Sequence, residues 1–258
     1  MTEQYSYIQR KLFIGGEWVD PIDGELVPSI NPATGAPWAL TAFGGVKDID
    51  RAVAAANEAM RGPWRTMPPS QRAGLIRKLG ELLEANAPRL AELETRDNGR
   101  PLRETRANIT AEAQWYYYFA GYADKMDGRV LEINPDVMAY TNRIPIGVVG
   151  AIVPWNAPTL VTTMKLAPAL AAGCAMVIKV AEHTTVTTSN SPSSSKRRAS
   201  RRAWSTSCRA MGRRRPPGRE QAELHRRAPD RARNHARRGD KPQTCFVRMR
   251  WKVPPYYF

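Results

Sequence analysis

Two apolar segments separated by a helical stretch, between Gly147 and Glu182, constrain the fold of this chain more than any other feature. Val148–Val153 and Ala175–Val180 are continuous apolar runs bounded by turn residues, and Leu160–Ala172 between them has helical character. Strands that are buried on both faces need not alternate polar with apolar residues, and two such strands joined by a helix form a parallel pair. The sequence therefore predicts a β-α-β unit in an α/β fold.

The residues that follow the two predicted strands are candidate binding residues. Ligands of open α/β sheets bind at the carboxyl ends of strands, so Pro154–Asn156 and Lys179–Glu182 are expected at one rim. The Asn156 amide can donate a hydrogen bond to an oxygen that becomes negative, although an ordinary turn residue is the alternative interpretation. Lys179 and Glu182 either hydrogen-bond ribose hydroxyls or form an exposed ion pair.

Other chemical signals in this part of the chain are weaker. Lys165 lies among apolar residues of the predicted helix, where it either supports the site by its charge or extends its ammonium group to the surface. No G-x-G-x-x-G motif follows a predicted strand, so the common dinucleotide fingerprint is missing. Cys174, Cys208 and Cys245 have neither disulfide nor metal-ligand spacing, which argues against a metal site.

The preceding residues predict a β-rich arm followed by a helical layer. Lys11–Val19 has the pattern of a strand and a turn. Helical spacing predicts one helix capped by Asp48 and ended by Gly62-Pro63, a second helix from Ser70 and a third from about Leu102. The third helix carries an aromatic group, for which core or subunit packing is favoured over ligand stacking: Trp115, Tyr116, Tyr117, Tyr118, Phe119 and Tyr122.

An extended hairpin is predicted over Gly128–Arg143, and a projecting hairpin of this kind often mediates oligomer contacts. The β-α-β unit that follows is expected to leave one sheet edge and one sheet face uncovered, because later strands and helices should cover them.

The character of the sequence changes near Thr188. Residues 1–188 hold 19 Lys and Arg against 20 Asp and Glu, whereas residues 189–258 hold 20 against 4, so the net charge of +15 comes from the tail. The tail has few aliphatic side chains to bury and is expected to be disordered. Its cations can bind polyanions without specificity, but it lacks the interleaved aromatics and folded motifs of specific nucleic-acid readers.

Signals for export or membrane insertion are missing from the chain. No secretory signal precedes the first predicted strand, and no apolar run approaches the roughly 18 residues of a transmembrane helix. We therefore expect a cytoplasmic protein without a membrane partner.

Several motifs occur in a fixed order between residues 12 and 188: LFIGGEWV, NPATG, E-x-x-x-N-G-R-P at Glu94–Pro101, IPIGVVGAIVPWNAP, KLAPALAAGC and IKVAEHT. Together they resemble the opening of the NAD(P)-dependent aldehyde dehydrogenase superfamily. The resemblance implies a partial Rossmann-like cofactor domain over residues 1–188, with an N-terminal β arm and a helical layer, followed by the disordered tail over residues 189–258. It also explains the missing glycine fingerprint, because this family holds its cofactor by other strand-end contacts.

The resemblance implies roles for the residues after the first strand of the unit. Asn156 matches the family's oxyanion asparagine, and the preceding residues match the loop that lines the nicotinamide: Val153, Pro154 and Trp155. Ala157 departs from the family, where an aromatic residue often follows the P-W-N triplet. This departure affects the expected shape of the substrate tunnel.

The resemblance implies further roles around the adenine ribose. Lys179 and Glu182 match the pair that holds this ribose, and Lys165 matches a helix lysine with a supporting charge role. Thr185 replaces a common proline. The implied cofactor is NAD, with NADP as the alternative, because the Glu182 carboxylate would repel a 2′-phosphate.

The sequence departs from the family pattern after Thr188. The family's next helix should be similar to LEFAKLVEEA. A GC-rich encoding of that peptide, read one base later, gives SNSPSSSKRR, which is Ser189–Arg198, and the shifted reading continues to Gly212. We therefore interpret the tail as the product of a frame change near codon 188 or 189, with arginines that come from GC-rich codons.

Complete members of the family oxidise an aldehyde to a carboxylate and form homo-oligomers. A cysteine thiolate attacks the aldehyde, hydride passes to the nicotinamide, and a glutamate-activated water hydrolyses the thioester. This chain lacks that nucleophile and that general base, and the apolar surroundings of Cys174 predict a structural role, so we expect the chain to be inactive. The alternative is a non-catalytic product that associates with intact homologues through the arm and hairpin, or with polyanions through the tail.

Overall fold

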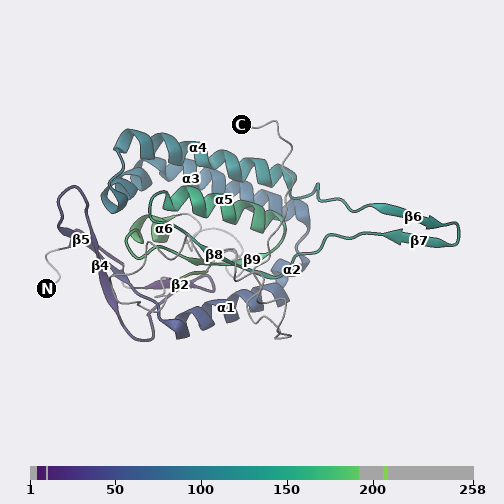
Figure 1. Ribbon diagram of the computed structural model, residues 1–258, viewed down its shortest axis with the longest axis horizontal. Helices are drawn as coiled ribbons and strands as arrows, with labels where there is room; N and C mark the ends of the chain where they lie inside the picture. The colour runs from purple at the N-terminus through teal and green to yellow at the C-terminus, as the bar shows by residue number, and fades with distance from the viewer. Residues whose placement is uncertain (1–4, 10, 192–205, 209–258) are drawn as a thin grey trace, which may run out of the picture. The chain divides into compact units, whose positions relative to one another are not determined.

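The computed structural model describes residues 5–9, 11–191 and 206–208 (Figure 1). The helices are α1 (Val46–Arg61), α2 (Pro63–Thr66), α3 (Pro69–Asn98), α4 (Leu102–Tyr122), α5 (Pro158–Ala171) and α6 (Val186–Asn190). The strands are β1 (Tyr7–Gln9), β2 (Leu12–Ile14), β3 (Glu17–Val19), β4 (Leu26–Ile30), β5 (Pro37–Ala42), β6 (Val130–Asn134), β7 (Val137–Tyr140), β8 (Val148–Ile152), β9 (Ala175–Lys179) and β10 (Thr206–Cys208). No helix in these described residues is long and apolar enough to cross a membrane.

A five-stranded sheet in the order β3-β2-β10-β9-β8 carries the predicted β-α-β unit. β8 and β9 are parallel, and α5 connects them, which confirms the prediction. β2 and β3 form an antiparallel hairpin through Gly15 and Gly16, both at positive φ. A separate sheet in the order β1-β5-β4 forms the rest of the predicted N-terminal arm.

Three residues of the predicted disordered tail form a strand instead. β10 pairs in parallel with β9 and antiparallel with β2. A strand edge offers unpaired N–H and C=O groups, so an extended segment can pair with it through its backbone whatever side chains it carries. The tail segments 192–205 and 209–258 lie outside the described residues.

Helices cover both faces of the β8–β9 pair, which corrects the expectation of an uncovered face. α3, α4 and α5 form a layer on one side, and α1 packs on the other (Figure 1). The main core lies between the helical layer and the sheet, and its fully buried side chains include Ile76, Leu90, Ile109, Leu166 and Ile178. β8 ends the strand order, as expected, and Ile152 is 70% exposed there.

The start of α1 differs from the prediction. The N-cap is Gly45, and Asp48 occupies the third helical position, where its Oδ2 accepts a hydrogen bond from the Gly45 backbone N–H at 3.1 Å. An acidic side chain at the third helical position can accept a hydrogen bond from the backbone N–H of the N-cap residue, as in a capping box. Asp48 therefore stabilises the helix start from inside it.

The predicted hairpin is present, and it projects from the rest of the described chain (Figure 1). β6 and β7 pair antiparallel, and most of their apolar side chains are exposed, with Met138 at 86% and Val130 at 78%. Its role in oligomer contacts stays a prediction.

The aromatic group of α4 divides between two environments. Tyr116 is 2% exposed in the core and Phe119 packs against that core, whereas Trp115, Tyr118 and Tyr122 are exposed. Core packing thus accounts for only part of the group. Tyr118 and Tyr122 stack on each other with ring centroids 6.4 Å apart.

Candidate functional site

The carboxyl ends of β8 and β9 bring the two predicted groups of site residues to the same rim. Ile152 lies opposite Lys179 in the parallel register, and the Val153 backbone N–H donates to the Lys179 carbonyl at 2.9 Å. The loop of residues 153–157, which we call the β8 loop, therefore starts beside Lys179. Residues 180–185 form the β9 loop, which contains Glu182.

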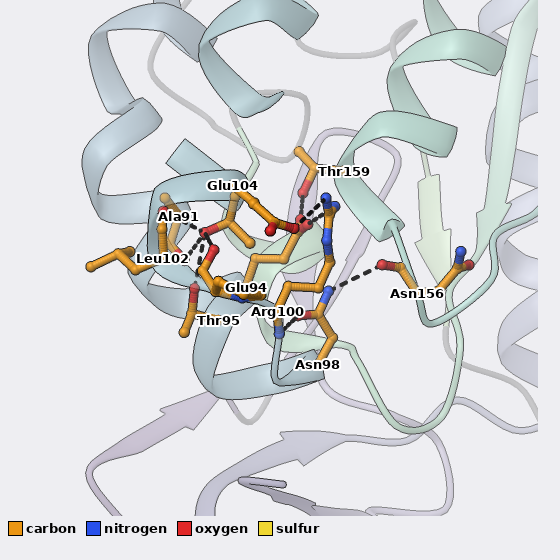
Figure 2. A network of polar contacts seen from close by, with 11 residues as sticks. Ala91, Glu94, Thr95, Asn98, Arg100, Leu102, Glu104, Asn156 and Thr159 are labelled. Atoms are coloured by element: carbon orange, nitrogen blue, oxygen red, sulfur yellow. Dashed lines mark hydrogen bonds and ion pairs between the residues drawn. The ribbon is translucent and has the colours of Figure 1, made fainter. Parts of the chain in front are cut away.

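The β8 loop combines one buried anchor with three exposed residues. Val153 is 1% exposed, while Trp155 is 57% exposed and Pro154 and Asn156 are also exposed. The Asn98 side-chain amide donates to the Asn156 backbone carbonyl at 3.4 Å. Figure 2 shows the Asn156 side chain pointing away from Asn98, which leaves its amide available to a ligand.

Lys179 and Glu182 form an ion pair with an Nζ–Oε1 distance of 2.6 Å, and their side chains are 27% and 41% exposed. An ammonium group has three donors and a carboxylate has about four acceptor positions, so both retain hydrogen-bonding capacity while paired. This donor and acceptor set fits the vicinal hydroxyls of a ribose. The partly exposed ion pair agrees with one of the two sequence interpretations. Its donors and acceptors also suit the other interpretation, hydrogen bonding to ribose hydroxyls.

Lys165 and Cys174 have contrasting surroundings. Lys165 is exposed on α5, and no ion pair within the described residues includes it, so its supporting role stays a prediction. Cys174 is 1% exposed, and the Trp64 indole N–H lies within hydrogen-bonding distance of its carbonyl, at 3.3 Å. This burial fits the structural role expected for Cys174. Across the described residues, no group of three His, Cys, Asp or Glu side chains is arranged to hold a metal ion.

Buried acids to which the sequence assigned no role lie next to the site. Glu94 is 1% exposed, its Oε2 accepts a hydrogen bond from the Thr159 hydroxyl, and its Oε1 lies 3.8 Å from the Arg100 guanidinium (Figure 2). Burial raises the pKa of Glu94, while the Thr159 hydrogen bond and the Arg100 charge oppose that rise. A sequence signal existed, because Glu94 continues the buried stripe of α3 through Leu83, Ala87 and Leu90.

Glu112 is a second buried acid, 2% exposed on α4. Its Oε2 has no hydrogen-bond partner among the described residues. Burial raises the pKa of Glu112 to about 9, the nearby Glu94 carboxylate adds to the rise, and Arg100 opposes it. Glu112 is therefore a neutral carboxylic acid at pH 7.

Comparison with known proteins identifies the family. A family model described as the aldehyde dehydrogenase family matches residues 18–191, well over half of the chain. The chain belongs to the aldehyde dehydrogenase family. Aldehyde dehydrogenase 1 from Tanacetum cinerariifolium is 48% identical over 176 residues, which cover 67% of this chain and 35% of that protein. The mitochondrial aldehyde dehydrogenase of Homo sapiens is 41% identical over 189 residues, covering 72% of this chain and 37% of the human protein.

Solved aldehyde dehydrogenase structures share the fold. The NAD⁺ complex of the enzyme from Bacillus cereus is 36% identical with a TM-score of 0.75, covering 79% of this chain and 42% of that one. Betaine aldehyde dehydrogenase from Staphylococcus aureus, also in complex with NAD⁺, is 31% identical with a TM-score of 0.76 over 79% of this chain and 42% of that one. The chain thus spans less than half the length of the relatives it matches.

Proposed function

We propose that residues 18–191 are the cofactor-side part of an NAD(P)-dependent aldehyde dehydrogenase and bind the cofactor at the rim of β8 and β9. One observation carries the proposal: the exposed β8 loop and the Lys179–Glu182 ion pair meet at neighbouring strand ends. In this proposal Lys179 and Glu182 hold the adenine ribose, while Pro154 and Trp155 line the nicotinamide side. Val153, which the resemblance also assigns to that side, is 1% exposed and instead anchors the β8 loop. A bound nicotinamide ring would be the hydride acceptor.

NAD is the preferred cofactor in this proposal. A Glu182 carboxylate that holds the adenine ribose would repel a 2′-phosphate, and two structurally similar aldehyde dehydrogenases are complexes with NAD⁺. A similar structure from E. coli is described as NADP-dependent, so both cofactors belong in the assay.

Calorimetric titration of the full chain with NAD⁺ and NADP⁺ tests the ribose contact. Lys179→Ala is expected to weaken NAD⁺ binding by about tenfold, the equivalent of one charged hydrogen bond. Lys78→Ala is a matched control, because Lys78 also forms an i,i+3 ion pair with a glutamate at 2.6 Å, with Glu81 on α3. Equal affinities of the wild-type chain and the Lys179 variant would contradict the assignment.

Catalysis by this chain alone is not expected. Family chemistry requires a nucleophilic thiolate beside the nicotinamide, and Cys174 is buried with 1% exposure. Asn156 supplies an oxyanion donor and Lys165 at most a supporting charge, and neither side chain is a nucleophile. Incubation with NAD⁺ and a panel of aldehydes should produce no reduced cofactor, and measurable turnover would reverse this part of the proposal.

A frame change in the gene accounts for the tail. The family match ends at Ser191, a few residues after the junction that the shifted reading of Ser189–Arg198 places at about residue 188. Sequencing the gene across this junction tests the idea directly. An uninterrupted frame that encodes the same tail in close relatives would contradict it.

The second candidate function is association without catalysis. It is supported by the exposed apolar side chains of the β6–β7 hairpin, which form an apolar surface that an intact homologue could cover. Co-expression with a full-length homologue followed by size-exclusion chromatography tests it, with a hairpin-deleted chain as the comparison. Binding of polyanions by the tail and a cytoplasmic location remain predictions.

A further inference from the structure

The end of α3 contacts the β8 loop directly and also contacts the helix starts that follow the β8 and β9 loops. The Asn98 Nδ2 donates to the Asn156 carbonyl in the β8 loop at 3.4 Å, and the Asn98 Oδ1 accepts from the Arg100 backbone N–H at 3.0 Å. The second hydrogen bond fixes the orientation of the Asn98 amide, so the first is directed at the loop (Figure 2).

Glu94, one turn earlier, stabilises the start of α5, which follows the β8 loop directly. The N-cap of α5 is Ala157, whose side chain cannot accept a hydrogen bond, and the first helical residue is Pro158. The buried Glu94 carboxylate accepts from the Thr159 hydroxyl, and a hydrogen bond with the Thr159 backbone also acts on it. An acceptor from another helix thus replaces the missing cap, and its negative charge complements the positive end of the α5 dipole.

Asp97 makes the equivalent contacts with the segment after the β9 loop. Its Oδ2 accepts from the backbone N–H groups of Val186 and Thr187, at 3.0 and 3.4 Å, at the start of α6. Its Oδ1 accepts from the Ser29 hydroxyl at 2.6 Å, which holds the carboxylate in place. Asp97 is 3% exposed, so these hydrogen bonds are shielded from water.

We infer that the last turns of α3, through Glu94, Asp97 and Asn98, position both loops of the cofactor site relative to each other. Each loop begins at a strand end, where the sheet fixes it, and ends at a helix start that α3 fixes. The three are positioning residues, since none is placed on the ligand itself. That the ordered loops bind a cofactor rests on the proposed function, whereas the ordering of the loops by α3 does not.

Hydrogen–deuterium exchange of the full chain measures the loop order directly. Asn98→Ala is expected to accelerate exchange of the amides of residues 155–157 and 159 by about tenfold, the equivalent of one lost hydrogen bond, and to leave the α3–α4 core amides unchanged. Asn86→Ala is the matched control, because Asn86 lies on the same helix and its Nδ2 donates to the Leu82 carbonyl at 2.7 Å, away from both loops. Unchanged exchange in the β8 loop, or equal acceleration by both variants, would overturn the inference.

A second pair of variants keeps the inference testable if Asn98→Ala destabilises the whole fold. Thr159→Val keeps the shape of the side chain and removes the hydroxyl that donates to Glu94, whereas Thr159→Ser retains a hydroxyl. The valine variant should accelerate exchange at the start of α5, and the serine variant should restore wild-type protection. Equal protection in the two variants contradicts a positioning role for Glu94.

Cofactor titration separates this inference from the proposed function. If the wild-type chain binds NAD⁺, Asn98→Ala should weaken binding by about fivefold while Asn86→Ala does not, because a disordered loop must be ordered on binding. Unchanged affinity in Asn98→Ala would contradict the positioning role. If the wild-type chain binds neither cofactor, the proposed function fails, and the exchange experiment still decides whether α3 orders the loops.

Discussion

Individual buried charges in this chain differ in how they are compensated. Glu94 has a hydroxyl donor and the Arg100 guanidinium, whereas Oε2 of Glu112 has no hydrogen-bond partner among the described residues. Arg72 is 7% exposed and donates to the carbonyls of Ala171 and Met67, at 3.3 and 3.2 Å. Glu112 is therefore the acid whose ionisation would cost the fold most.

The stability of the described fold should depend on pH through Glu112. Its pKa rises from 4.5 in the unfolded chain to about 9 in the fold, so folding takes up a proton between these values. The contribution of Glu112 to the free energy of unfolding is fully present below about pH 4.5 and is lost as the pH rises to about 9.

Glu112→Gln tests this dependence. The variant should flatten the fall in stability between pH 5 and pH 9, measured by urea unfolding, because glutamine has no proton to lose in this range (roughly one pKa unit corresponds to 1.4 kcal/mol). Glu92→Gln, at an exposed position of α3, should keep the wild-type slope. Parallel slopes for all three chains would show that Glu112 does not titrate in this way.

At the level of elements, α3 compensates both ends of α5. Glu94 lies at the start of α5 and Arg72 donates to the carbonyl of Ala171 at its end, so each charge opposes the dipole end beside it. One long helix thus fixes the crossover helix of the β-α-β unit at two points.

The C-terminal end of α3 requires a glycine in the left-handed backbone conformation. Gly99 is its C-cap with φ +80°, and a Cβ there would lie 2.7 Å from Cγ of Pro32. Gly99→Ala should destabilise the fold by about 1–3 kcal/mol, because both the left-handed conformation and the contact oppose a side chain.

Gly74→Ala on the same helix should have the opposite sign. A Cβ at Gly74 meets nothing within 4 Å, so alanine should stabilise the interior of α3 by about 0.5–1 kcal/mol. Thermal unfolding of both variants measures the difference. Equal melting temperatures would contradict the assigned conformation of Gly99.

Elements formed by local patterns could be predicted from the sequence, and the long-range polar contacts could not. The helices, the hairpin and the β-α-β unit follow from the spacing of apolar residues and turn signals. By contrast, the hydrogen bond between Glu94 and Thr159 spans 65 residues of sequence, and that between Asp97 and Val186 spans 89. Periodicity indicates that such acids are buried, but only the packed helices show which groups they meet.

At the level of the whole molecule, the edge strand β8 is a candidate contact between copies of the chain. Within the described residues β8 ends the five-stranded sheet, its sequence VVGAI has no charged residue, and Ile152 is 70% exposed. Natural sheet edges usually carry charges, prolines or bulges that prevent pairing between molecules. The chain should therefore self-associate as its concentration rises.

Ile152→Lys should reduce this association, since a charge on an edge strand opposes pairing with a second edge. Static light scattering over a concentration series measures the effect. Val46→Lys is the control, because Val46 is 71% exposed but lies on α1 and not at a sheet edge. If both variants scatter light equally, the β8 edge is not the contact.

The placement of Glu94, Asp97 and Asn98 ahead of both loops also bears on protein synthesis. Their contacts with the loops and helix starts join residues numbered 94 to 187, so all the groups involved have left the ribosome before the last part of the chain follows. Domains generally fold from the N-terminal side during translation. The nascent chain can therefore order both strand-end loops whatever reading frame supplies the codons after them.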